Sequence, residues 1–302
     1  MKVVITNLID LKPFERDTAL CLGFFDGVHR GHRALIETAQ ASGLDLAVLT
    51  FDRSPKAAIG SALLSTVEDR LAIFKSMGVT TTLLVIFDET VKSLSAEKFI
   101  ETLNRLNVKK VFCGPDFRFG HKAMGDSKML KYGLGRHFIT TIVDEVEEDH
   151  AKISSSRIVK HLQYGNINAA NKMLGRPYSI KGSVVKGKGN GRKLGYPTAN
   201  LSLSANYVLP LNGVYATAIT VQGQRFYSMT SVGYHPTIAP LEKPLVEVHI
   251  FDFKKNIYKQ DVNVEFLQFM RPEIAFATIG ELVVKMREDE REILALKNGL
   301  FK

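Results

Sequence analysis

Residues 23–32 read Gly23-Phe24-Phe25-Asp26-Gly27-Val28-His29-Arg30-Gly31-His32 and overlap the end of a short apolar run, Ala19–Phe24. Short, nearly continuous apolar runs are typical of strands that are buried on both faces. Four more follow, at Leu46–Phe51, Thr82–Phe87, Lys110–Cys113 and Phe138–Val143, with segments of helical period between them. Alternating strands and helices predict an α/β, doubly wound, Rossmann-like parallel sheet, and ligands bind at the carboxyl ends of such strands. Residues 23–32 occupy one of these ends.

Two helix starts are predicted in the same half. Ser65-Thr66-Val67-Glu68 has the pattern of a capping box, and Ser95 is placed to cap a helix that carries Phe99, Ile100 and Leu103.

The two histidines of the opening stretch suggest phosphate chemistry. His29 and His32 are three residues apart at the start of a helix, so they share a face. A helix N-terminus suits an anion, and imidazoles there can donate hydrogen bonds to a phosphate whose charge grows in the transition state. Glycines at 23, 27 and 31 allow a ligand to approach the backbone closely. Two surface histidines beside a turn, or a zinc site lacking its third ligand, are the alternatives.

From about residue 180 the pattern changes to short β-rich runs punctuated by Gly and Pro. The runs are Ser183–Val185, Gly213–Thr220, Gln224–Val232, Pro244–Phe251 and Asp261–Phe269. This spacing predicts an antiparallel barrel or sandwich. A closing helix from about 279 to 297 presents Leu282, Met286, Ile293 and Leu296, and its charge run Arg287–Arg291 is interpreted as a solvated face.

A glycine-rich stretch opens this second half, with glycines at 182, 187, 189, 191 and 195. It is not a P-loop, because Gly189 stands where that motif needs Ser or Thr. A loop that closes over nucleotide phosphates and a cluster of β-turns remain as interpretations. Thr198 and Asn200 follow in Gly195-Tyr196-Pro197-Thr198-Ala199-Asn200, which on its own fits any turn. In an extended segment their side chains project the same way and offer neutral oxygens to Mg²⁺.

Composition sets the outer limits. The chain has 302 residues, of which 45% are hydrophobic and 24% charged, with a formal net charge of +9 spread over both halves. These values predict two globular domains and exclude a disordered or collagen-like chain. Cys21 and Cys113 are far apart, so a thiolate zinc site is excluded. No apolar run approaches the roughly 18 residues of a membrane span. The apolar segment at the start of the sequence is too short for a secretory signal, so a cytoplasmic location is expected.

The ordered motifs resemble those of bacterial bifunctional riboflavin kinase/FAD synthetases, over essentially the whole chain. Residues 23–32 resemble the nucleotidylyltransferase His-x-Gly-His signature of that family. Residues 114–120 (Gly-Pro-Asp-Phe-Arg-Phe-Gly) resemble its flavin- and nucleotide-binding segment, and Ile153-Ser154-Ser155-Ser156-Arg157-Ile158 resembles its ATP-phosphate segment. Arg192, the Pro197–Asn200 segment and Gly213-Val214-Tyr215-Ala216 resemble its riboflavin kinase module.

The resemblance implies a role for each matching residue. Glu247, in Val246-Glu247-Val248-His249, is the implied catalytic base of the kinase, against the alternative of an exposed strand residue. Arg271, before Pro272-Glu273, is either a flavin-side contact or a helix-cap partner. The other implied roles are catalysis by His29 and His32, ATP binding by Gly23, Phe24, Asp26, Gly31, Ser154, Ser155, Ser156 and Arg157, flavin or nucleotide binding by Asp116, Phe117 and Phe119, phosphate binding by Gly187, Gly189, Gly191 and Arg192, and metal binding by Thr198 and Asn200.

The implied domains are an adenylyltransferase at 1–160, a helical linker at 161–178 and a riboflavin kinase at 179–302. The implied activity is phosphorylation of riboflavin to FMN, then adenylylation of FMN to FAD, with ATP and Mg²⁺. Partners are small molecules, with no membrane and no nucleic acid expected; the oligomeric state is left open.

Several positions depart from the family pattern. Val159 stands where the family has an arginine, Ser156 where it has a threonine and Ser54 where it usually has a histidine, and residues 231–237 also differ. Arginine clamps a phosphate with two hydrogen bonds, which valine cannot do. A riboflavin kinase with weak or lost adenylyl transfer is therefore one alternative. A non-catalytic regulator that binds flavin or nucleic acid is the other.

Overall fold

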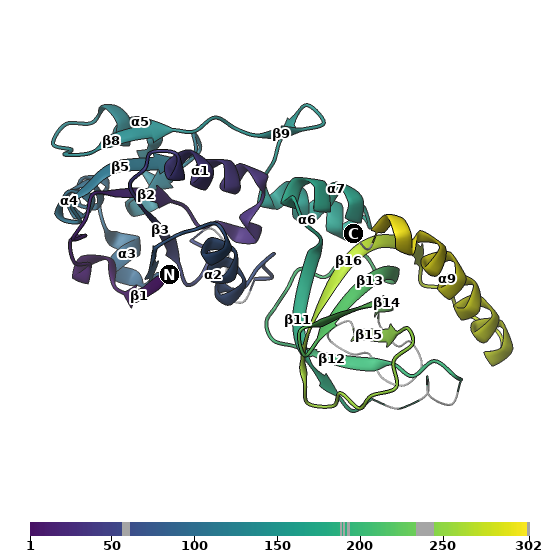
Figure 1. Ribbon diagram of the computed structural model, residues 1–302. Coiled ribbons are helices and arrows are strands. Elements are labelled where there is room, and N and C mark those ends of the chain that lie inside the picture. Colours follow the sequence, from purple (N-terminus) through teal and green to yellow (C-terminus); the bar gives the residue numbers. More distant parts are fainter. Residues whose placement is uncertain (56–60, 188, 190, 192–193, 234–244, 301–302) are drawn as a thin grey trace. The chain divides into compact units, whose positions relative to one another are not determined.

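The computed structural model describes residues 1–302 except 56–60, 188, 190, 192–193, 234–244 and 301–302, and the side chains of 297, 298 and 300. Arg192 and most of the departing segment 231–237 therefore lie outside the described residues. The chain divides into two compact units, Met1–Ser155 and Ser156–Lys302 (Figure 1). Each unit is described by itself below.

The first unit is built on a six-stranded parallel sheet in the order β1-β4-β3-β2-β5-β8. Its strands are β1 (Lys2–Thr6), β2 (Thr18–Leu22), β3 (Asp45–Phe51), β4 (Thr81–Val85), β5 (Val108–Cys113) and β8 (Ile139–Ile142). The five predicted strands are confirmed. The sequence pattern missed β1, because this edge strand is largely exposed and lacks a continuous buried run. Two-residue strands form the small pairs β6 (Arg118–Phe119) with β7 (Gly125–Asp126), and β9 (Glu147–Glu148) with β10 (Ala151–Lys152).

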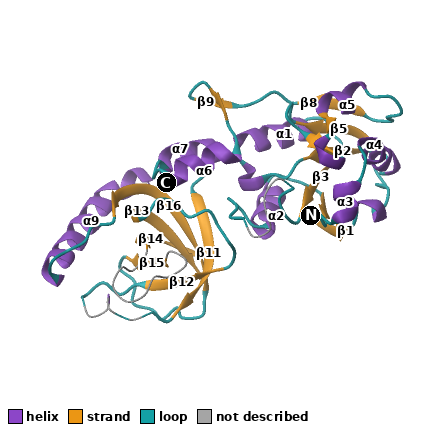
Figure 2. Cartoon of the chain, turned by 180° about the vertical axis from the view of Figure 1, so that it is seen from behind, coloured by secondary structure: helices purple, strands orange, loops and turns teal. Residues whose placement is uncertain are grey.

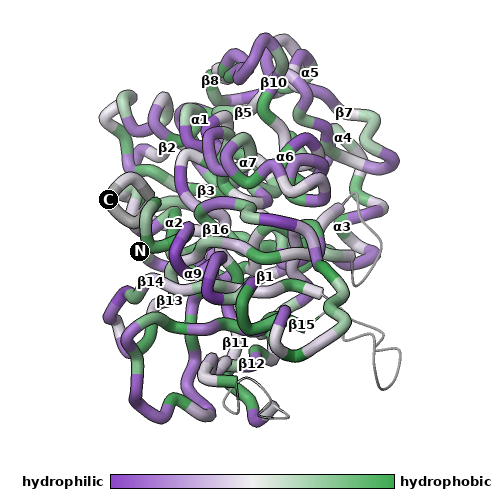
Figure 3. Tube along the Cα trace, turned by 90° about the vertical axis from the view of Figure 1, so that its right-hand side faces the viewer, coloured by the Kyte–Doolittle hydropathy of each residue, from purple (hydrophilic) through white to green (hydrophobic). Residues whose placement is uncertain are grey.

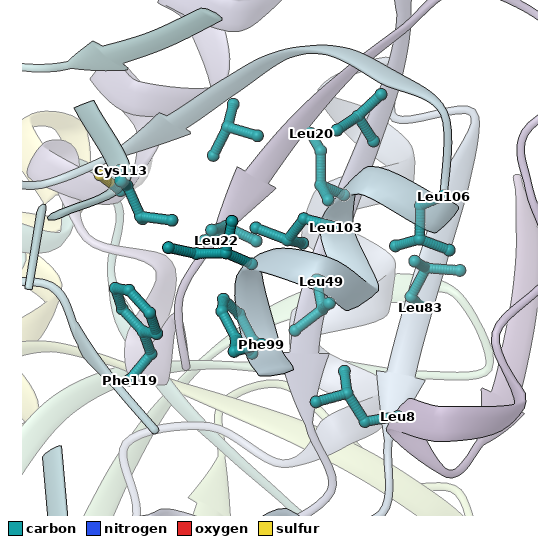
Figure 4. Close-up of a cluster of buried hydrophobic side chains, with 14 of the residues drawn as sticks. Leu8, Leu20, Leu22, Leu49, Leu83, Phe99, Leu103, Leu106, Cys113 and Phe119 are labelled. Atoms are coloured by element: carbon teal, nitrogen blue, oxygen red, sulfur yellow. The ribbon is translucent and has the colours of Figure 1, made fainter. Parts of the chain in front are cut away.

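Helices cover both faces of the sheet, so the doubly wound prediction is confirmed. On one face α1 (Arg30–Gln40) and α2 (Val67–Ser76) bury Ile36 and Phe74 against Cys21 and Val48. On the other, α3 (Glu89–Ser93), α4 (Ala96–Arg105) and α5 (Ser127–Tyr132) pack on the cluster that contains Leu22 and Phe99 (Figure 4). Single turns η1 (Leu8–Asp10), η2 (Asp26–Val28) and η3 (His121–Ala123) complete the unit.

The helix caps differ in part from the prediction. Ser95 caps α4 as predicted, accepting a hydrogen bond from the Lys98 amide at 3.3 Å. The predicted capping box at α2 was wrong by one residue, because Thr66 and Asp69 form it, with bonds of 3.1 and 3.0 Å. Ser65 therefore does not cap α2, and its hydroxyl instead contacts the loop after β2.

The strand order reverses between β2 and β5, which lie side by side in the sheet. Ligands of doubly wound sheets bind in the crevice at such a point. Residues 23–29, after β2, and 114–117, after β5, border it. The quoted sequence stretch therefore lies where the topology favours a site.

The second unit is a closed antiparallel barrel in the order β11-β12-β15-β14-β13-β16 (Figure 2). Its strands are β11 (Tyr178–Val185), β12 (Ala199–Leu203), β13 (Gly213–Val221), β14 (Gln224–Gly233), β15 (Leu245–Ile250) and β16 (Asp261–Pro272). The predicted barrel is confirmed, but β12 was missed. The segment before the barrel is helical, as α6 (Ser155–Gln163) and α7 (Ile167–Leu174), and α7 is tied to β16 because the Asn171 amide donates to the Phe266 carbonyl at 2.9 Å.

The helix α9 (Ile279–Leu300) packs along the outside of the barrel through Met286 and Ile293. The interpretation of Arg287–Arg291 as a purely solvated face was wrong. Asp289 is only 1% exposed and forms an ion pair with Arg271 of β16. No helix among the described residues is long and apolar enough to cross a bilayer, since hydrophilic residues interrupt the helical segments (Figure 3).

Candidate active sites

The loop after β2 has an unusual backbone. Phe25, Gly27 and Val28 have φ values of 60°, 73° and 40°, a region that L side chains rarely adopt. This path ends at His29, which is the N-cap of α1 and accepts a hydrogen bond from the His32 amide on Nδ1 at 3.3 Å. In a neutral ring the proton of His29 is then on Nε2.

The predicted histidine pair is brought together. The two rings are stacked, with centroids 3.6 Å apart and planes at 16°. Gly31 makes room for them, because a Cβ there would lie 3.3 Å from the His29 ring. Within the described part of the chain, the buried Nδ1 of His32 has no hydrogen-bond partner. Burial, with smaller contributions from His29, Arg70 and Lys152, holds the pKa of His32 well below its ordinary value. At neutral pH His32 is therefore an uncharged donor or acceptor.

The Asp26 carboxylate is occupied by the chain itself. It accepts hydrogen bonds from the amides of Leu64 and Ser65 at 3.2 and 3.0 Å and from the Ser65 hydroxyl at 3.1 Å. The Gly27 amide donates to the same hydroxyl at 2.7 Å. Burial raises the pKa of Asp26, and these hydrogen bonds oppose the rise. Asp26 therefore shapes the loop and presents little of its carboxylate to a ligand.

The serine segment contacts this loop, because the Ser155 hydroxyl donates to the Asp26 carbonyl at 3.0 Å. Ser154 is half-buried, whereas Ser156 is exposed. Ser156 and Arg157 belong to the first turn of α6, and Val159 follows in the same helix.

The predicted residues after β5 divide into two groups. Asp116 is exposed and pairs with Lys152, with 2.8 Å between the charged atoms, and Lys152 also contacts Glu145. Phe117 is half-buried. Phe119 lies in the core, its ring centroid 4.8 Å from that of Phe99 (Figure 4). Asp116 and Phe117 can therefore meet a ligand directly, whereas Phe119 supports the segment from within.

In the barrel, the ladder brings the predicted base next to a predicted metal ligand. Glu247 of β15 is directly opposite Asn200 of β12 on one side and Ser231 of β14 on the other. Directly opposed residues project their side chains to the same face. Because the barrel interior is packed with residues such as Val246 and Val248, this face is the outer one. A carboxylate, a carboxamide and a hydroxyl are thus aligned across three strands.

The glycine-rich loop packs directly on the predicted metal ligands. A Cβ on Gly187 would lie 2.4 Å from the Asn200 amide nitrogen. A Cβ on Gly191 would lie 2.2 Å from the Tyr196 carbonyl and 3.3 Å from the Thr198 hydroxyl. Gly189 has a φ of 74° and open space around it. The backbone of Gly187 therefore lies against Asn200 and that of Gly191 near Thr198, next to the loop predicted to hold phosphates.

Neighbouring residues fix this segment to the barrel and to α9. His249 Nδ1 lies 2.9 Å from the Pro197 carbonyl, and the Tyr196 hydroxyl donates to Glu290 at 3.0 Å. Burial, followed by the Glu290 carboxylate, raises the pKa of Tyr196. Arg271 donates three hydrogen bonds to Asp289, at 2.7–3.0 Å, in the middle of α9. Arg271 is therefore not a helix-cap partner, and most of its guanidinium is already engaged.

The donor set suits a hard divalent cation. Thr198 and Asn200 supply neutral oxygens, and Glu247 supplies a carboxylate on the same face. Within the part of the chain that the structure describes, no three His, Cys, Asp or Glu side chains form a cluster able to hold a metal. A cation at Thr198 and Asn200 would therefore complete its coordination with oxygens from a bound phosphate or water.

Sequence reasoning missed Arg70 and Ser65, the two side chains that hold the first loop in place. The available signal was the spacing of Arg70 and Phe74, four residues apart on the buried face of α2. A charged residue on an apolar helix face is buried only when its hydrogen bonds are satisfied.

Comparisons with known proteins also divide the chain into two parts. A family model described as FAD synthetase matches residues 11–157, and one described as riboflavin kinase matches residues 174–296. A bifunctional riboflavin kinase/FMN adenylyltransferase of Bacillus subtilis (strain 168) is 35% identical over 304 residues, which cover 97% of this chain and 96% of that protein. The protein of the same description from Listeria monocytogenes is 36% identical over 287 residues, with 91% of each chain covered.

A solved structure from Streptococcus pneumoniae, described as a macrolide-efflux protein, superimposes with a TM-score of 0.87 at 33% identity. It covers 96% of this chain and 98% of its own. The relatives match both units over nearly their full length, so the chain belongs to the bifunctional riboflavin kinase/FMN adenylyltransferase family.

Proposed function

We propose that the chain phosphorylates riboflavin to FMN in its barrel unit and adenylylates FMN to FAD in its parallel-sheet unit, with ATP as the donor in both steps. The alignment of Glu247 with Asn200 under the Gly187 loop carries the kinase assignment. The stacked histidines at the carboxyl end of β2 support the second step.

In the kinase step, Glu247 accepts the proton of the riboflavin 5′-hydroxyl as that oxygen attacks the γ-phosphorus of ATP. The new O–P bond forms while the bond to the β-phosphate oxygen breaks, and ADP leaves. The backbone of Gly187, Gly189 and Gly191, together with Arg192, positions the phosphates. Thr198 and Asn200 would hold Mg²⁺, which neutralises charge on the phosphates when it is bound.

In the adenylyl step, a phosphate oxygen of FMN attacks the α-phosphorus of a second ATP, and pyrophosphate leaves. This nucleophile is already ionised near pH 7, so no protein base is needed. His29 and His32 donate hydrogen bonds to the phosphate oxygens as their charge grows. Gly23 and Phe24, in the loop that Asp26 shapes, Gly31 at the start of α1, and the segment 154–157 bind ATP. Asp116 and Phe117, supported by Phe119, bind flavin or nucleotide.

The first test is a chromatographic assay of the purified chain with ATP, Mg²⁺ and either riboflavin or FMN. FAD from both flavins supports two working sites and shows that Val159 is tolerated. FMN as the final product, with added FMN left unconverted under oxidising and reducing conditions, supports the kinase-only alternative. No product from either flavin contradicts both enzymatic assignments and favours a regulator, for which salt-dependent RNA binding is the next measurement.

The variant Glu247→Gln tests the base. It keeps the size of the side chain but cannot take up the proton, so we expect FMN formation to stop while conversion of added FMN to FAD continues. Glu265→Gln is the matched control, because Glu265 is also on a barrel strand but pairs with Arg225 at 2.8 Å. Equal loss of FMN formation in both variants would remove Glu247 from its role as base.

A further inference from the structure

We propose that Arg70 of α2 is a positioning residue for adenylyl transfer, because its buried guanidinium holds the loop that presents His29 and His32. The proposal rests on the adenylyl transfer proposed above. Arg70 is 1% exposed and is the largest fully buried side chain among the described residues.

The guanidinium is bound to the two strand ends that flank the site. Its Nη1 donates to the Phe24 carbonyl at 2.7 Å and to the Thr50 hydroxyl at 2.8 Å, and its Nη2 donates to the Phe51 carbonyl at 3.0 Å. Thr50 also donates to the Phe24 carbonyl, at 2.9 Å. The guanidinium carbon lies 4.5 Å from the centre of the Phe24 ring. Arg70 and Thr50 therefore fix the first turn of the loop through the Phe24 carbonyl.

This loop needs external support, because Phe25 and Val28 are non-glycine residues with positive φ. Such backbone conformations are strained and persist only when their surroundings enforce them. The strained path buries the Phe25 ring, which contacts the His32 ring edge-on with centroids 5.1 Å apart. A relaxed loop would therefore lose the contact that seats His32.

Other residues of the same segment add to this support. Phe74, one turn after Arg70 in α2, packs edge-on against Phe25 at 5.5 Å between ring centroids. Ser65, just before the helix, binds both Asp26 and Gly27. The segment 64–74 thus contacts the loop from its first turn to η2. Because His29 and His32 follow the loop directly, the position of the loop sets the positions of both rings.

Lysine cannot replace this arrangement fully. Burial lowers the pKa of Arg70 to about 10, so the group remains protonated at neutral pH. Its planar fork reaches three acceptors at once, one in the loop after β2 and two at the end of β3, whereas an ammonium is a single point charge.

The test uses the full chain with Arg70→Lys and Thr50→Val. Displacement of reacting groups by about 1 Å can cost a hundredfold in rate, so we expect kcat for FMN adenylylation to fall roughly tenfold to a hundredfold in each variant. We expect KM for ATP to change less than threefold. Riboflavin phosphorylation by the other unit is the internal control. Thr82→Val is the matched control for Thr50→Val, since Thr82 is also fully buried, in the adjacent strand β4, and its hydroxyl contacts Met1.

The imidazole resonances of His32, measured by NMR, give a second readout that does not depend on activity. We expect them to shift in Arg70→Lys and Thr50→Val but not in Thr82→Val. A kcat within threefold of wild type, or unshifted resonances, would overturn the positioning role. If the wild-type chain makes no FAD from FMN, the proposed function fails, and the resonances alone then decide whether Arg70 positions the histidines.

Discussion

At the scale of single residues, Gly187 shows how the absence of a side chain shapes the candidate kinase site. Its backbone lies against the Asn200 carboxamide so closely that even a methyl group would sit 2.4 Å from the amide nitrogen. The constraint is steric and local, because Asn200 is itself fixed in β12 between β11 and β15. A larger residue at 187 must therefore push away either the loop or the carboxamide.

Gly187→Ala is expected to raise KM for ATP in riboflavin phosphorylation by about tenfold, which corresponds to about 1.4 kcal/mol of binding free energy. FAD formation from FMN should not change. Steady-state kinetics with both flavins checks this result. Gly299→Ala is the control, because a Cβ at Gly299 in α9 would meet no atom within 4 Å. An unchanged KM in Gly187→Ala would show that the loop does not hold the phosphates.

His32 couples the first unit to pH. Its pKa is lowered by burial in the folded state, so the unfolded chain binds the proton more readily. The contribution of the neutral His32 ring to stability is therefore fully present above the ordinary histidine pKa of about 6.5. It is lost as the pH falls below that value, and the free energy of unfolding declines. Asp26, whose pKa burial raises, acts in the opposite direction, and comparison with a variant removes its contribution.

We expect the free energy of opening of β2 and β3 amides, measured by hydrogen exchange, to fall between pH 7 and pH 5. In His32→Asn this decline should be smaller. His137→Asn, which replaces an exposed histidine of the same unit, should behave as wild type. Parallel pH profiles in all three proteins would contradict the assignment.

At the scale of elements, α9 is attached to the barrel by charged residues that the sequence suggested were solvated. Arg271 and Asp289 form a buried ion pair, with their side chains 14% and 2% exposed. One residue further along α9, Glu290 accepts the hydrogen bond of Tyr196, two residues before Thr198. The helix therefore connects the end of β16 to the segment that carries the candidate metal ligands.

Asp289→Asn should destabilise the barrel unit by about 3 kcal/mol, because removing one partner of a buried pair leaves the other unpaired. It should also slow riboflavin phosphorylation, since Tyr196 loses a fixed anchor. Thermal unfolding and kinase assays check both effects. Glu288→Gln provides the comparison, because Glu288 is 44% exposed in its pair with Lys285 and should matter little. If the two variants are equally stable, the buried pair does not hold α9.

Elements were predicted well wherever burial leaves a periodic pattern in the sequence. The five predicted strands of the parallel sheet and most of the barrel strands have continuous or alternating apolar residues. The strands β1 and β12 were missed, because β1 is mostly exposed and β12 is a five-residue strand that begins within the Pro197–Asn200 segment, which on its own fits any turn. The capping box was misplaced by one residue, since Ser and Thr are both favoured N-caps and the hydrogen bond of Ser65 to Asp26 leaves Thr66 as the cap.

At the scale of the whole molecule, the motifs predicted which loops form the sites but not what supports them. His29 and His32 lie in one short stretch of sequence, whereas the Arg70 guanidinium reaches the same loop from a helix more than 40 residues further on. Asn200 and Glu247 are likewise joined only by the register of β12 with β15. Long-range contacts of this kind depend on the assembled fold, so spacing in one sequence cannot show them.

The division into two compact units, each with its own site, makes a prediction about the whole chain. Glu247→Gln should lack kinase activity, and the double variant His29→Ala/His32→Ala should lack adenylyl transfer. Neither protein alone should convert riboflavin to FAD. A mixture of the two should do so, because FMN made by the histidine variant reaches the intact first unit of the other chain through solution.

Chromatography of the mixture over time measures this complementation. We expect FMN to appear first and FAD to follow after a lag that shortens as the concentration of the Glu247→Gln chain rises, since the transfer is bimolecular. Glu247→Gln supplied with FMN is the positive control. FAD formed by the histidine variant alone would exclude His29 and His32 from the chemistry. A mixture that forms no FAD and no more than one FMN per chain of the histidine variant, while the positive control works, would mean that FMN does not leave the chain that makes it, and the two sites would then have to act within one molecule.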